Sequence, residues 1–451
     1  MRILHYFLGF PPYRTGGLTR FACDLMETQS VNGNEVMAVW PGEMKILSKK
    51  TQFKKHKTRK NIQNYEMINP LPVSLDEGIS NIDSFCKEFD PLCFEKFLKK
   101  VKPEVFHIHT LMGLPKEFVE KANELGIRTV FTTHDYFGIC PKVTLFTGGN
   151  VCDNDFNCLL CEQCNKNALS NTKIILLQSP LYRLLKNSVI VRCLRKKHRM
   201  EYYDSSLVQI DKSFNNLEKS DSYIKLRNYY KNILEKVEII HYNSYLTKKI
   251  FEKYIKPKSG KVITISHKNI RDNKKIFELR QGNIVRMAML APPTTIKGFD
   301  YLKSVLDRIW DSGNRNFTLK VYGYVAADKK SEYLQVVEEG FDNNCLEDVF
   351  KEVDIVVVPS IWYETFGFTV LEALSYGIPV IVTDRVGASC IVGDAGIIVR
   401  ANDSNDLEKQ IIELSVQKVK ELKIKAQNNT CVKLWDDFVK EMYNIYECKD
   451  C

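Results

Sequence analysis

The chain has 451 residues, is 44% hydrophobic and 27% charged, and carries a formal net charge of +10. This length predicts two domains, and this composition excludes a disordered or fibrous chain. No apolar run reaches the length that spans a bilayer, and Pro11 and Pro12 stand where a secretory signal would be cleaved. The N-terminus is therefore predicted to be a first strand.

The first half of the chain alternates strand-like apolar runs with helix-like periodicity. The predicted strands are residues 2–10, 35–42, 105–112, 128–135 and 261–267, and the predicted helices are residues 18–33 and 115–127. Residues 201–255 are polar and predicted to be helical. The β-α-β order predicts a parallel, doubly wound sheet.

The second half repeats this order. The predicted strands are residues 283–290, 317–324, 354–360 and 379–384, and the predicted helices are residues 299–310, 368–377 and the tail from about residue 405. Gly377 and Pro379 supply the stop signals of the helix before them. The predicted domains are an N-terminal Rossmann-like domain, residues 1–270, a C-terminal Rossmann-like domain, residues 283–430, and a C-terminal helix, residues 431–451, that packs back toward the N-terminal domain.

Positive charge is concentrated in two segments of the first half. Residues 44–60 hold eight Lys or Arg and residues 166–200 hold nine, with no acidic residue in either segment. The second segment begins a basic helical insertion, residues 166–240, with apolar residues at helical spacing: Leu181, Leu184, Leu185 and Val189. This combination predicts an amphipathic helix on an anionic membrane surface. A solvated basic face over a small core is the alternative, and no nucleic-acid motif accompanies the charge.

A cysteine cluster precedes this insertion, within residues 140–164. Downstream of Cys140, the spacing C-x5-C-x2-C-x2-C is formed by Cys152, Cys158, Cys161 and Cys164. Four thiolates this close together predict a structural zinc site. Iron–sulfur binding is less well matched because the usual Cys-Pro step is absent, and free thiols are the remaining alternative.

Two glutamates interrupt the apolar stretch YETFGFTVLEALSYGIPV. Glu364 follows a predicted buried strand, and Glu372 lies eight residues later in the next helix. Between them, Thr365, Phe366 and Gly367 form the helix entrance, whose backbone N–H groups and dipole suit an anion such as a phosphate. Carboxylates are rarely buried without a partner, so the pair is predicted to bind a ligand.

This stretch resembles the E-x7-E region of retaining glycosyltransferases with the GT-B fold, glycosyltransferase family 4 (group 1). The match covers residues 359–388, and four further segments follow the family's order. TGGLTR (15–20) is similar to the glycine loop after the first strand, and EVFHIHT (104–110) to the acceptor-side histidine strand. FTTHDYFGICP (131–141) is similar to the segment of a subgroup that acts on polysaccharide precursors, and KGFDYL (297–302) to the phosphate-binding step. The resemblance implies an α/β fold of two Rossmann-like domains with a cleft between them.

The resemblance also implies a role for each matching residue. Glu372 would hold the ribose hydroxyls of the donor nucleotide, and Glu364 would orient the transferred sugar, aided by the helix entrance. Lys297 would neutralise the diphosphate. Gly16 and Gly17 would let backbone N–H groups approach the same diphosphate. The family's usual arginine just before this lysine is missing from MLAPPTTIKG, and Arg286 comes too early in the chain to replace it.

Two histidines are predicted near the acceptor or the transferred sugar. His107 and His109 are assigned to opposite faces of their strand, with His109 at the site and His107 a candidate core residue. His134 is a second site candidate at the same sheet edge, although Asp135 could simply hold it in place.

The resemblance thus implies a retaining hexosyltransferase that needs no metal or other cofactor for catalysis. Its donor would be a UDP- or GDP-sugar and its acceptor a lipid-linked or polysaccharide glycan of the cell surface. It would be cytoplasmic, on the inner face of the membrane. A nucleotide-sugar epimerase of the same fold, or a catalytically silent GT-B scaffold in a membrane complex, is the alternative.

Overall fold

The computed structural model describes the whole chain apart from a set of short segments. These are residues 46–47, 49, 76, 153–155, 187, 190, 192, 194–216, 275–281, 339, 341–345, 430 and 448–451. The chain forms two compact units. The first comprises Met1–Asn243, Lys248–Ile263 and Val439–Cys451, and the second comprises Ser244–Thr247 and Thr264–Phe438.

The first unit is built on an eight-stranded sheet in the order β10-β9-β6-β5-β1-β2-β4-β3. Its strands pair in parallel except for β3, which runs antiparallel to β4. The strands are β1 (Arg2–Tyr6), β2 (Glu35–Pro41), β3 (Gln52–Arg59), β4 (Ile62–Ile68), β5 (Val105–Ile108), β6 (Arg128–Thr132), β9 (Ile239–Tyr242) and β10 (Gly260–Val262), with a short hairpin of β7 (Phe146–Thr147) and β8 (Asn150–Val151). The predicted parallel sheet is confirmed.

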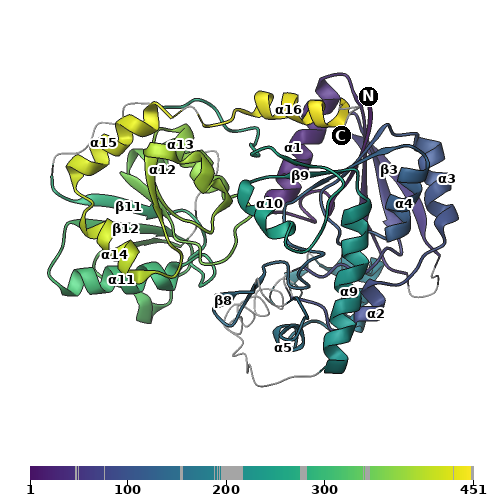
Figure 1. Cartoon of the computed structure of the whole chain (residues 1–451), viewed down its shortest axis with the longest axis horizontal. Helices are drawn as coiled ribbons and strands as arrows, with labels where there is room; N and C mark the ends of the chain where they lie inside the picture. Colours follow the sequence, from purple (N-terminus) through teal and green to yellow (C-terminus); the bar gives the residue numbers. More distant parts are fainter. Residues whose placement is uncertain are drawn as a thin grey trace. The chain divides into compact units, whose positions relative to one another are not determined.

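Helices connect these strands in the right order for a doubly wound sheet. They are α1 (Gly17–Val31), α2 (Ile82–Phe85), α3 (Pro91–Val101), α4 (Lys116–Glu124), α5 (Cys161–Cys164), α6 (Asn171–Leu177), α7 (Pro180–Leu185), α9 (Leu217–Lys236), α10 (Tyr245–Phe251) and α16 (Trp435–Glu447). Figure 1 shows α9 beside α2 and α4, against which it packs. Buried aromatic residues of α9, among them Tyr223 and Tyr230, fill this contact.

Three strands of this sheet differ from the sequence prediction. The basic segment 44–60 contains the edge strand β3, whose side chains are mostly exposed. Lysines are common on edge strands because they prevent pairing with another chain, so this charge has a structural explanation. The strand β4 was not predicted because its polar residues hide the alternation. The strand β9 lies within residues 201–255, which were predicted to be entirely helical.

The second unit is built on a fully parallel six-stranded sheet in the order β13-β12-β11-β14-β15-β16. The strands are β11 (Val285–Met289), β12 (Phe317–Tyr322), β13 (Leu334–Val337), β14 (Ile355–Val358), β15 (Val380–Thr383) and β16 (Gly396–Val399). The helices are α11 (Phe299–Asp311), α12 (Leu346–Lys351), α13 (Phe368–Ser375), α14 (Ser404–Ile412) and α15 (Val416–Gln427), with short 3-10 turns at Ala327–Lys329, Gly387–Ile391 and Gly393–Ala395.

Apolar residues explain how these helices cover the second sheet. In α11 the buried positions are spaced by three or four residues, so one face of the helix is apolar. This face packs with α14, α15 and the strands into one buried cluster. The helix α13 ends at Ser375 with Tyr376 as its C-cap, and Gly377 follows with a φ of +71°, which confirms the predicted stop. Among the described helices, none is both long and apolar enough to cross a membrane.

Candidate functional site

Three polar side chains meet beyond the end of β14 in the second unit. The Nζ atom of Lys297 lies 2.6 Å from Oε1 of Glu364, and the Ser360 hydroxyl donates to Oε2 over 2.6 Å. Side chains of the lysine and glutamate keep 22% and 16% of their surface exposed, so solvent reaches the pair. All three residues follow the carboxyl ends of parallel strands, where open α/β sheets bind ligands.

Two glycines allow the backbone to form this arrangement. Gly298 has a φ of +81°, and a Cβ atom there would lie 1.8 Å from the carbonyl oxygen of Pro359. Only glycine therefore lets the loop that carries Lys297 come this close to the end of β14. Gly367 has a φ of +96°, and a Cβ atom there would lie 2.7 Å from Val386. It is the N-cap of α13, which has no side-chain cap.

The segment between β14 and α13 is fixed by backbone hydrogen bonds to the segment that follows β15. The N–H group of Glu364 donates to the carbonyl of Arg385 over 2.9 Å, and Gly387 donates to the carbonyl of Glu364 over 2.9 Å. Ala388 donates to the carbonyl of Phe366 over 2.6 Å. The helix entrance, which includes Thr365, is thus held rigidly, with the positive end of the helix dipole at the site.

Glu372 lies on the buried side of α13, with 7% of its surface exposed. Its Oε1 atom accepts a hydrogen bond of 3.1 Å from Nε2 of His267. The backbone N–H of Asn269 donates to Nδ1 of the same ring over 3.3 Å, so the ring proton is on Nε2. His267 therefore holds the carboxylate in one orientation. The sequence analysis missed this residue because it lies 105 positions earlier in the chain.

The first unit carries the other glycines of the predicted site. Gly16 and Gly17 follow β1 at the start of α1, and both are exposed. Gly16 has a φ of +113°, and a Cβ atom there would meet no atom within 4 Å. A glycine is thus required at position 16 by the backbone conformation and not by close packing, and the space beside it is open.

The histidines of β5 correct one prediction. His107 and His109 do not face opposite sides, because residues two positions apart in a strand share a face. Their ring centroids lie 4.1 Å apart, and both are fully buried. Nδ1 of His109 lies 3.3 Å from Nε2 of His134, which is partly exposed after the end of β6. Burial lowers the pKa of His134 to about 3, so both rings are neutral at pH 7.

Burial also affects the residue next to this histidine. It raises the pKa of Asp135 to about 6, opposed by the hydrogen bond that its carboxylate accepts from the N–H of Phe137. That bond is local and 2.9 Å long. Asp135 therefore caps the turn after β6, and the role of holding His134 in place stays a prediction.

The cysteines of the predicted metal site are brought only partly together. Cys158 and Cys161 are buried and adjacent, and a hydrogen bond between them, followed by burial, raises the pKa of the Cys161 thiol. Arg227 lies beside them, with Nη2 4.0 Å from Sγ of Cys161. In the part of the chain that the structure describes, Cys152 and Cys164 do not complete a group of metal-ligand spacing with them. The zinc site stays a prediction.

The basic insertion exposes its apolar residues. In α7, Leu181, Leu184 and Leu185 keep 58%, 81% and 49% of their surface exposed. Val189, which lies beyond the end of α7, keeps 76%. Arg183 is drawn inward, since its Nη2 atom lies 2.6 Å from the buried Glu66 carboxylate. Five of the remaining basic residues of segment 166–200 lie outside the described residues, namely Arg192, Arg195, Lys196, Lys197 and Arg199.

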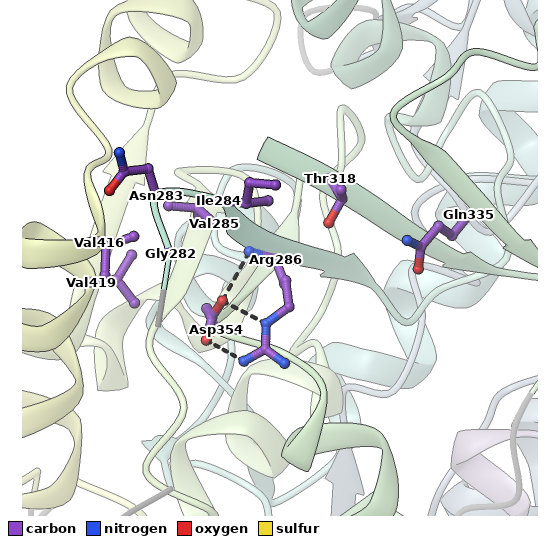
Figure 2. A pocket seen from close by; sticks show the side chains of 10 residues that line it. All are labelled: Gly282, Asn283, Ile284, Val285, Arg286, Thr318, Gln335, Asp354, Val416 and Val419. Atoms are coloured by element: carbon purple, nitrogen blue, oxygen red, sulfur yellow. Dashed lines mark hydrogen bonds and ion pairs between the residues drawn. The ribbon is translucent and has the colours of Figure 1, made fainter. Parts of the chain in front are cut away.

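Arg286 lies at the beginning of β11, whereas Lys297 follows the carboxyl end of the same strand. Figure 2 shows it in a cavity of about 320 Å³, where its guanidinium forms a bidentate pair with Asp354. Lys423 of α15 approaches the same carboxylate to 3.3 Å. Arg286 therefore ties the beginnings of β11 and β14 together. It does not replace the missing arginine, as the sequence analysis expected.

The second unit matches a known family. Residues 282–416 match the family model described as "Glycosyl transferases group 1". Over these residues, the second unit contains a domain similar to the group 1 glycosyl transferases. Lys297, Ser360, Glu364 and Glu372 all lie within this domain, so the site built above belongs to it.

Similar proteins were found both by sequence and by structure. An uncharacterised 42.6 kDa protein of the Klebsiella pneumoniae cps region is 25% identical over 65% of this chain and 60% of its own length. The O-antigen chain mannosyltransferase B of Escherichia coli is 27% identical over 32% of this chain and 33% of its own. The Escherichia coli UDP-Gal:alpha-D-GlcNAc-diphosphoundecaprenol alpha-1,3-galactosyltransferase is 28% identical over 22% and 27%. The chain thus spans less than two thirds of these relatives.

Solved structures define the fold of the whole chain. Sucrose-phosphate synthase from Thermosynechococcus elongatus has a TM-score of 0.56 at 13% identity, over 99% of this chain and 98% of its own. HepE from Anabaena, in complex with UDP and glucose, has a TM-score of 0.53 at 13% identity, over 99% of each chain. The chain has the GT-B fold, as the sequence predicted.

Two further residues of the group 1 domain escaped the sequence analysis. Ser360 lies at the end of the predicted strand 354–360, yet its hydroxyl donates to the carboxylate of Glu364. Arg385 follows β15, where Nη1 donates to the carbonyl of Ile361 over 2.6 Å and the guanidinium lies 5.8 Å from the ring of Tyr363. It is a basic residue at the same sheet edge as Lys297. Its position in the sequence after a strand was the available signal.

Proposed function

We propose that this chain is a retaining glycosyltransferase that moves a sugar from a nucleotide-diphosphate sugar to a lipid-linked or polysaccharide acceptor of the cell surface. The observation that carries the proposal is the contact of Lys297 and Ser360 with the two carboxylate oxygens of Glu364, inside a group 1 glycosyl transferase domain. A cation, an oriented carboxylate and a helix N-terminus at one sheet edge suit a sugar bound next to a phosphate.

The donor roles follow from the chemistry of each group. Lys297 neutralises the charge that grows on the leaving diphosphate, and the N-terminus of α13 adds its dipole. Glu364 accepts hydrogen bonds from hydroxyls of the transferred sugar and keeps that sugar next to the lysine. Glu372 accepts hydrogen bonds from the ribose hydroxyls, and His267 keeps its carboxylate in place.

The reaction proposed is a displacement on one face of the sugar. The acceptor hydroxyl oxygen bonds to the anomeric carbon while the bond from that carbon to the phosphate oxygen breaks. The acceptor proton passes to the leaving phosphate oxygen, so no separate base and no metal is required. The transferred sugar keeps its anomeric configuration.

The acceptor side is proposed from the relatives and from the first unit. One relative's name specifies a diphosphoundecaprenol-linked acceptor and a UDP-sugar donor, and another's specifies O-antigen. The exposed leucines of α7, set among basic residues, suit contact with an anionic bilayer in which such a lipid resides. We accordingly propose a peripheral position on the inner membrane face.

Vesicle binding tests this position. We expect Leu184→Glu to reduce co-sedimentation with vesicles that contain phosphatidylglycerol. Val31→Glu is the matched control, since Val31 is 83% exposed at the end of α1, compared with 81% for Leu184. Equal binding by both variants, or equal binding to vesicles of neutral lipid, would contradict the membrane proposal.

The transferase proposal is tested with a panel of UDP- and GDP-sugars. Thermal stabilisation by one donor identifies the nucleotide through mass action. Transfer to a diphosphate-lipid acceptor, with the anomeric configuration of the product read by NMR, then tests retention. Conversion of the sugar without an acceptor would indicate an epimerase instead. The absence of donor binding across the panel would indicate a silent scaffold.

A further inference from the structure

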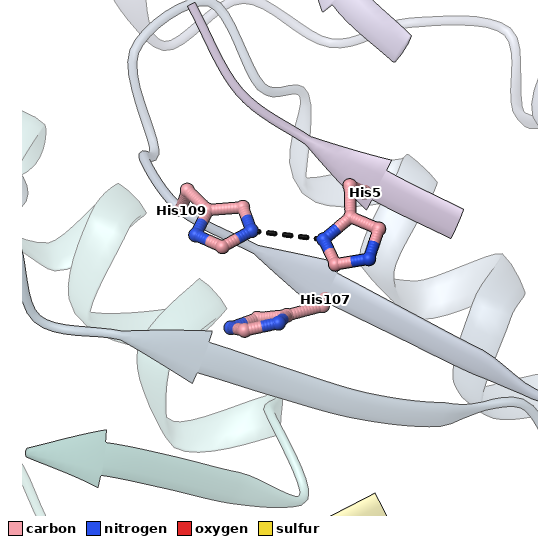
Figure 3. Close-up of side chains that lie close together, drawn as sticks. All are labelled: His5, His107 and His109. Carbon is pink, nitrogen blue, oxygen red and sulfur yellow. Dashed lines mark hydrogen bonds between the residues drawn. The ribbon is translucent and has the colours of Figure 1, made fainter. Parts of the chain in front are cut away.

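Three histidines form the centre of a buried polar network in the first unit. Figure 3 shows His5 of β1 next to His107 of β5 and His109, which directly follows β5. All three are fully buried. Their nitrogens lie close enough together to suggest a metal site. However, each of the six ring nitrogens already has a hydrogen-bond partner in the protein, so these rings are used as hydrogen-bonding groups.

The direction of the network is set by a backbone carbonyl. Nε2 of His241 lies 2.8 Å from the carbonyl oxygen of Ile263, which can only accept, so Nε2 carries the proton. Nδ1 of His241 must then accept from the Thr132 hydroxyl at 2.9 Å. The oxygen of that hydroxyl in turn accepts from Nε2 of His107 at 2.7 Å. His107 is left with an accepting Nδ1, to which Tyr446 donates over 2.6 Å.

The same logic continues through Tyr446 to the edge of the sheet. Because the Tyr446 hydroxyl donates its proton to His107, its oxygen accepts the hydrogen bond from Nε2 of Gln29 at 3.2 Å. The amide oxygen of Gln29 accepts from Nε2 of His5 at 2.7 Å. Nδ1 of His5 then accepts from Nε2 of His109 at 2.9 Å, and Nδ1 of His109 accepts from Nε2 of His134 at 3.3 Å.

This assignment requires that the histidines are neutral, and burial keeps them so. It lowers the pKa of His5 to about 4, despite the opposing hydrogen bond with Gln29. It also lowers the pKa values of His107 and His109 far below the usual value, with smaller effects from neighbouring histidines. One unbroken chain of donors and acceptors therefore runs from Ile263 to His134.

We infer that Gln29 and Tyr446 are positioning residues that fix the tautomers of His109 and His134 through this chain of hydrogen bonds. Both histidines then carry their proton on Nε2, and both rings are held in one orientation and one protonation pattern. His134 lies at the carboxyl edge of the sheet, where the acceptor sugar is proposed to bind. This last step rests on the proposed function, whereas the tautomers do not.

Selective ¹⁵N labelling of histidine and NMR at pH 7 test the assignment without any substrate. We expect His5, His107, His109, His134 and His241 all to be neutral with the proton on Nε2. A ring of this set with its proton on Nδ1, or with both nitrogens protonated, would overturn the inference. If the protein shows the expected tautomers but no transferase activity, the proposed function is overturned and this inference is not.

Tyr446→Phe tests the positioning role. The variant removes the proton donated to His107 and the oxygen that accepts from Gln29. We expect the His109 and His134 signals to shift, and kcat/KM for the acceptor to fall about fivefold, with the donor KM unchanged. Tyr443→Phe is the matched control. Tyr443 lies on the same helix as Tyr446, but its hydroxyl accepts from the side-chain amide of Asn34, which is not part of the histidine network. Equal effects of both variants, or no change in acceptor kinetics with Tyr446→Phe, would refute the role.

Discussion

Acidification is expected to destabilise the first unit more than the second. His5, His107 and His109 are fully buried, and burial lowers the pKa of His5 to about 4 and the pKa values of His107 and His109 far below the ordinary value of about 6.5. A lowered pKa in the folded state contributes stability that is complete above the unfolded value and is lost as the pH falls below it. The loss therefore begins near pH 6.5 and continues toward pH 4.

The magnitude follows from the number of protons taken up on unfolding. Between pH 7 and pH 5, each of the three histidines lowers the free energy of unfolding by about 1.9 kcal/mol, or roughly 5.5 kcal/mol together. Asp135 acts in the opposite direction, since its pKa is raised to about 6; it returns about 1.3 kcal/mol over the same range. His134, whose pKa is lowered to about 3, adds a further loss of about 1.9 kcal/mol. The net loss of about 6 kcal/mol is a large part of the stability of an ordinary domain.

Hydrogen exchange resolves the two units in one experiment. The exchange of peptides from β1 and β5, corrected for intrinsic rates, should show this loss of protection between pH 7 and pH 5. Peptides from β14 and β15 are the internal control, because His267 is the one histidine in the sequence of the second unit. If the free energy of opening of the first unit changes by less than about 1 kcal/mol between pH 7 and pH 5, the histidines are not buried in the neutral form and the network is refuted.

Three further changes have expected outcomes. Gly298→Ala places a Cβ atom against the carbonyl of Pro359. The KM for the donor should rise at least tenfold, which corresponds to about 1.4 kcal/mol of lost binding free energy. Unchanged donor kinetics would contradict the close approach of the two backbone segments. Asp354→Ala leaves Arg286 and Lys423 without their shared carboxylate, so the second unit should lose about 3 kcal/mol in urea unfolding; a loss below about 1 kcal/mol would show that the charges are solvated. If the predicted zinc site exists, elemental analysis finds one zinc per chain, and Ser in place of one cysteine ligand removes it; zinc-free wild-type protein contradicts that prediction.

The second unit was largely predictable from the sequence. Its central strands are continuous apolar runs such as IVVV in β14, and α11 and α13 are followed by Gly313 and Gly377, so these elements could be placed from local patterns alone. The two glutamates were found because each stands out in an apolar context. Their partners were not found, since Ser360 reads as part of a strand, and His267 lies 105 residues before Glu372.

The first unit was less predictable, for physical reasons. The edge strand β3 has no buried face, so it shows no apolar alternation that would reveal it. The histidine network joins residues that are far apart in the chain: Gln29 and Tyr446 are separated by 417 positions. Neither has a neighbour in sequence that signals its role, and only the fold brings them to the same side of the sheet.

The central claim is tested most directly by the release of nucleoside diphosphate from a sugar donor in the presence of acceptor. We compare the wild type with Glu364→Gln, which keeps the size of the side chain but removes the charge that pairs with Lys297. Glu413→Gln, at an exposed position after α14, is the control. The account predicts acceptor-dependent release that falls at least a hundredfold, about 2.7 kcal/mol, in Glu364→Gln alone. Wild-type release by that variant would contradict it.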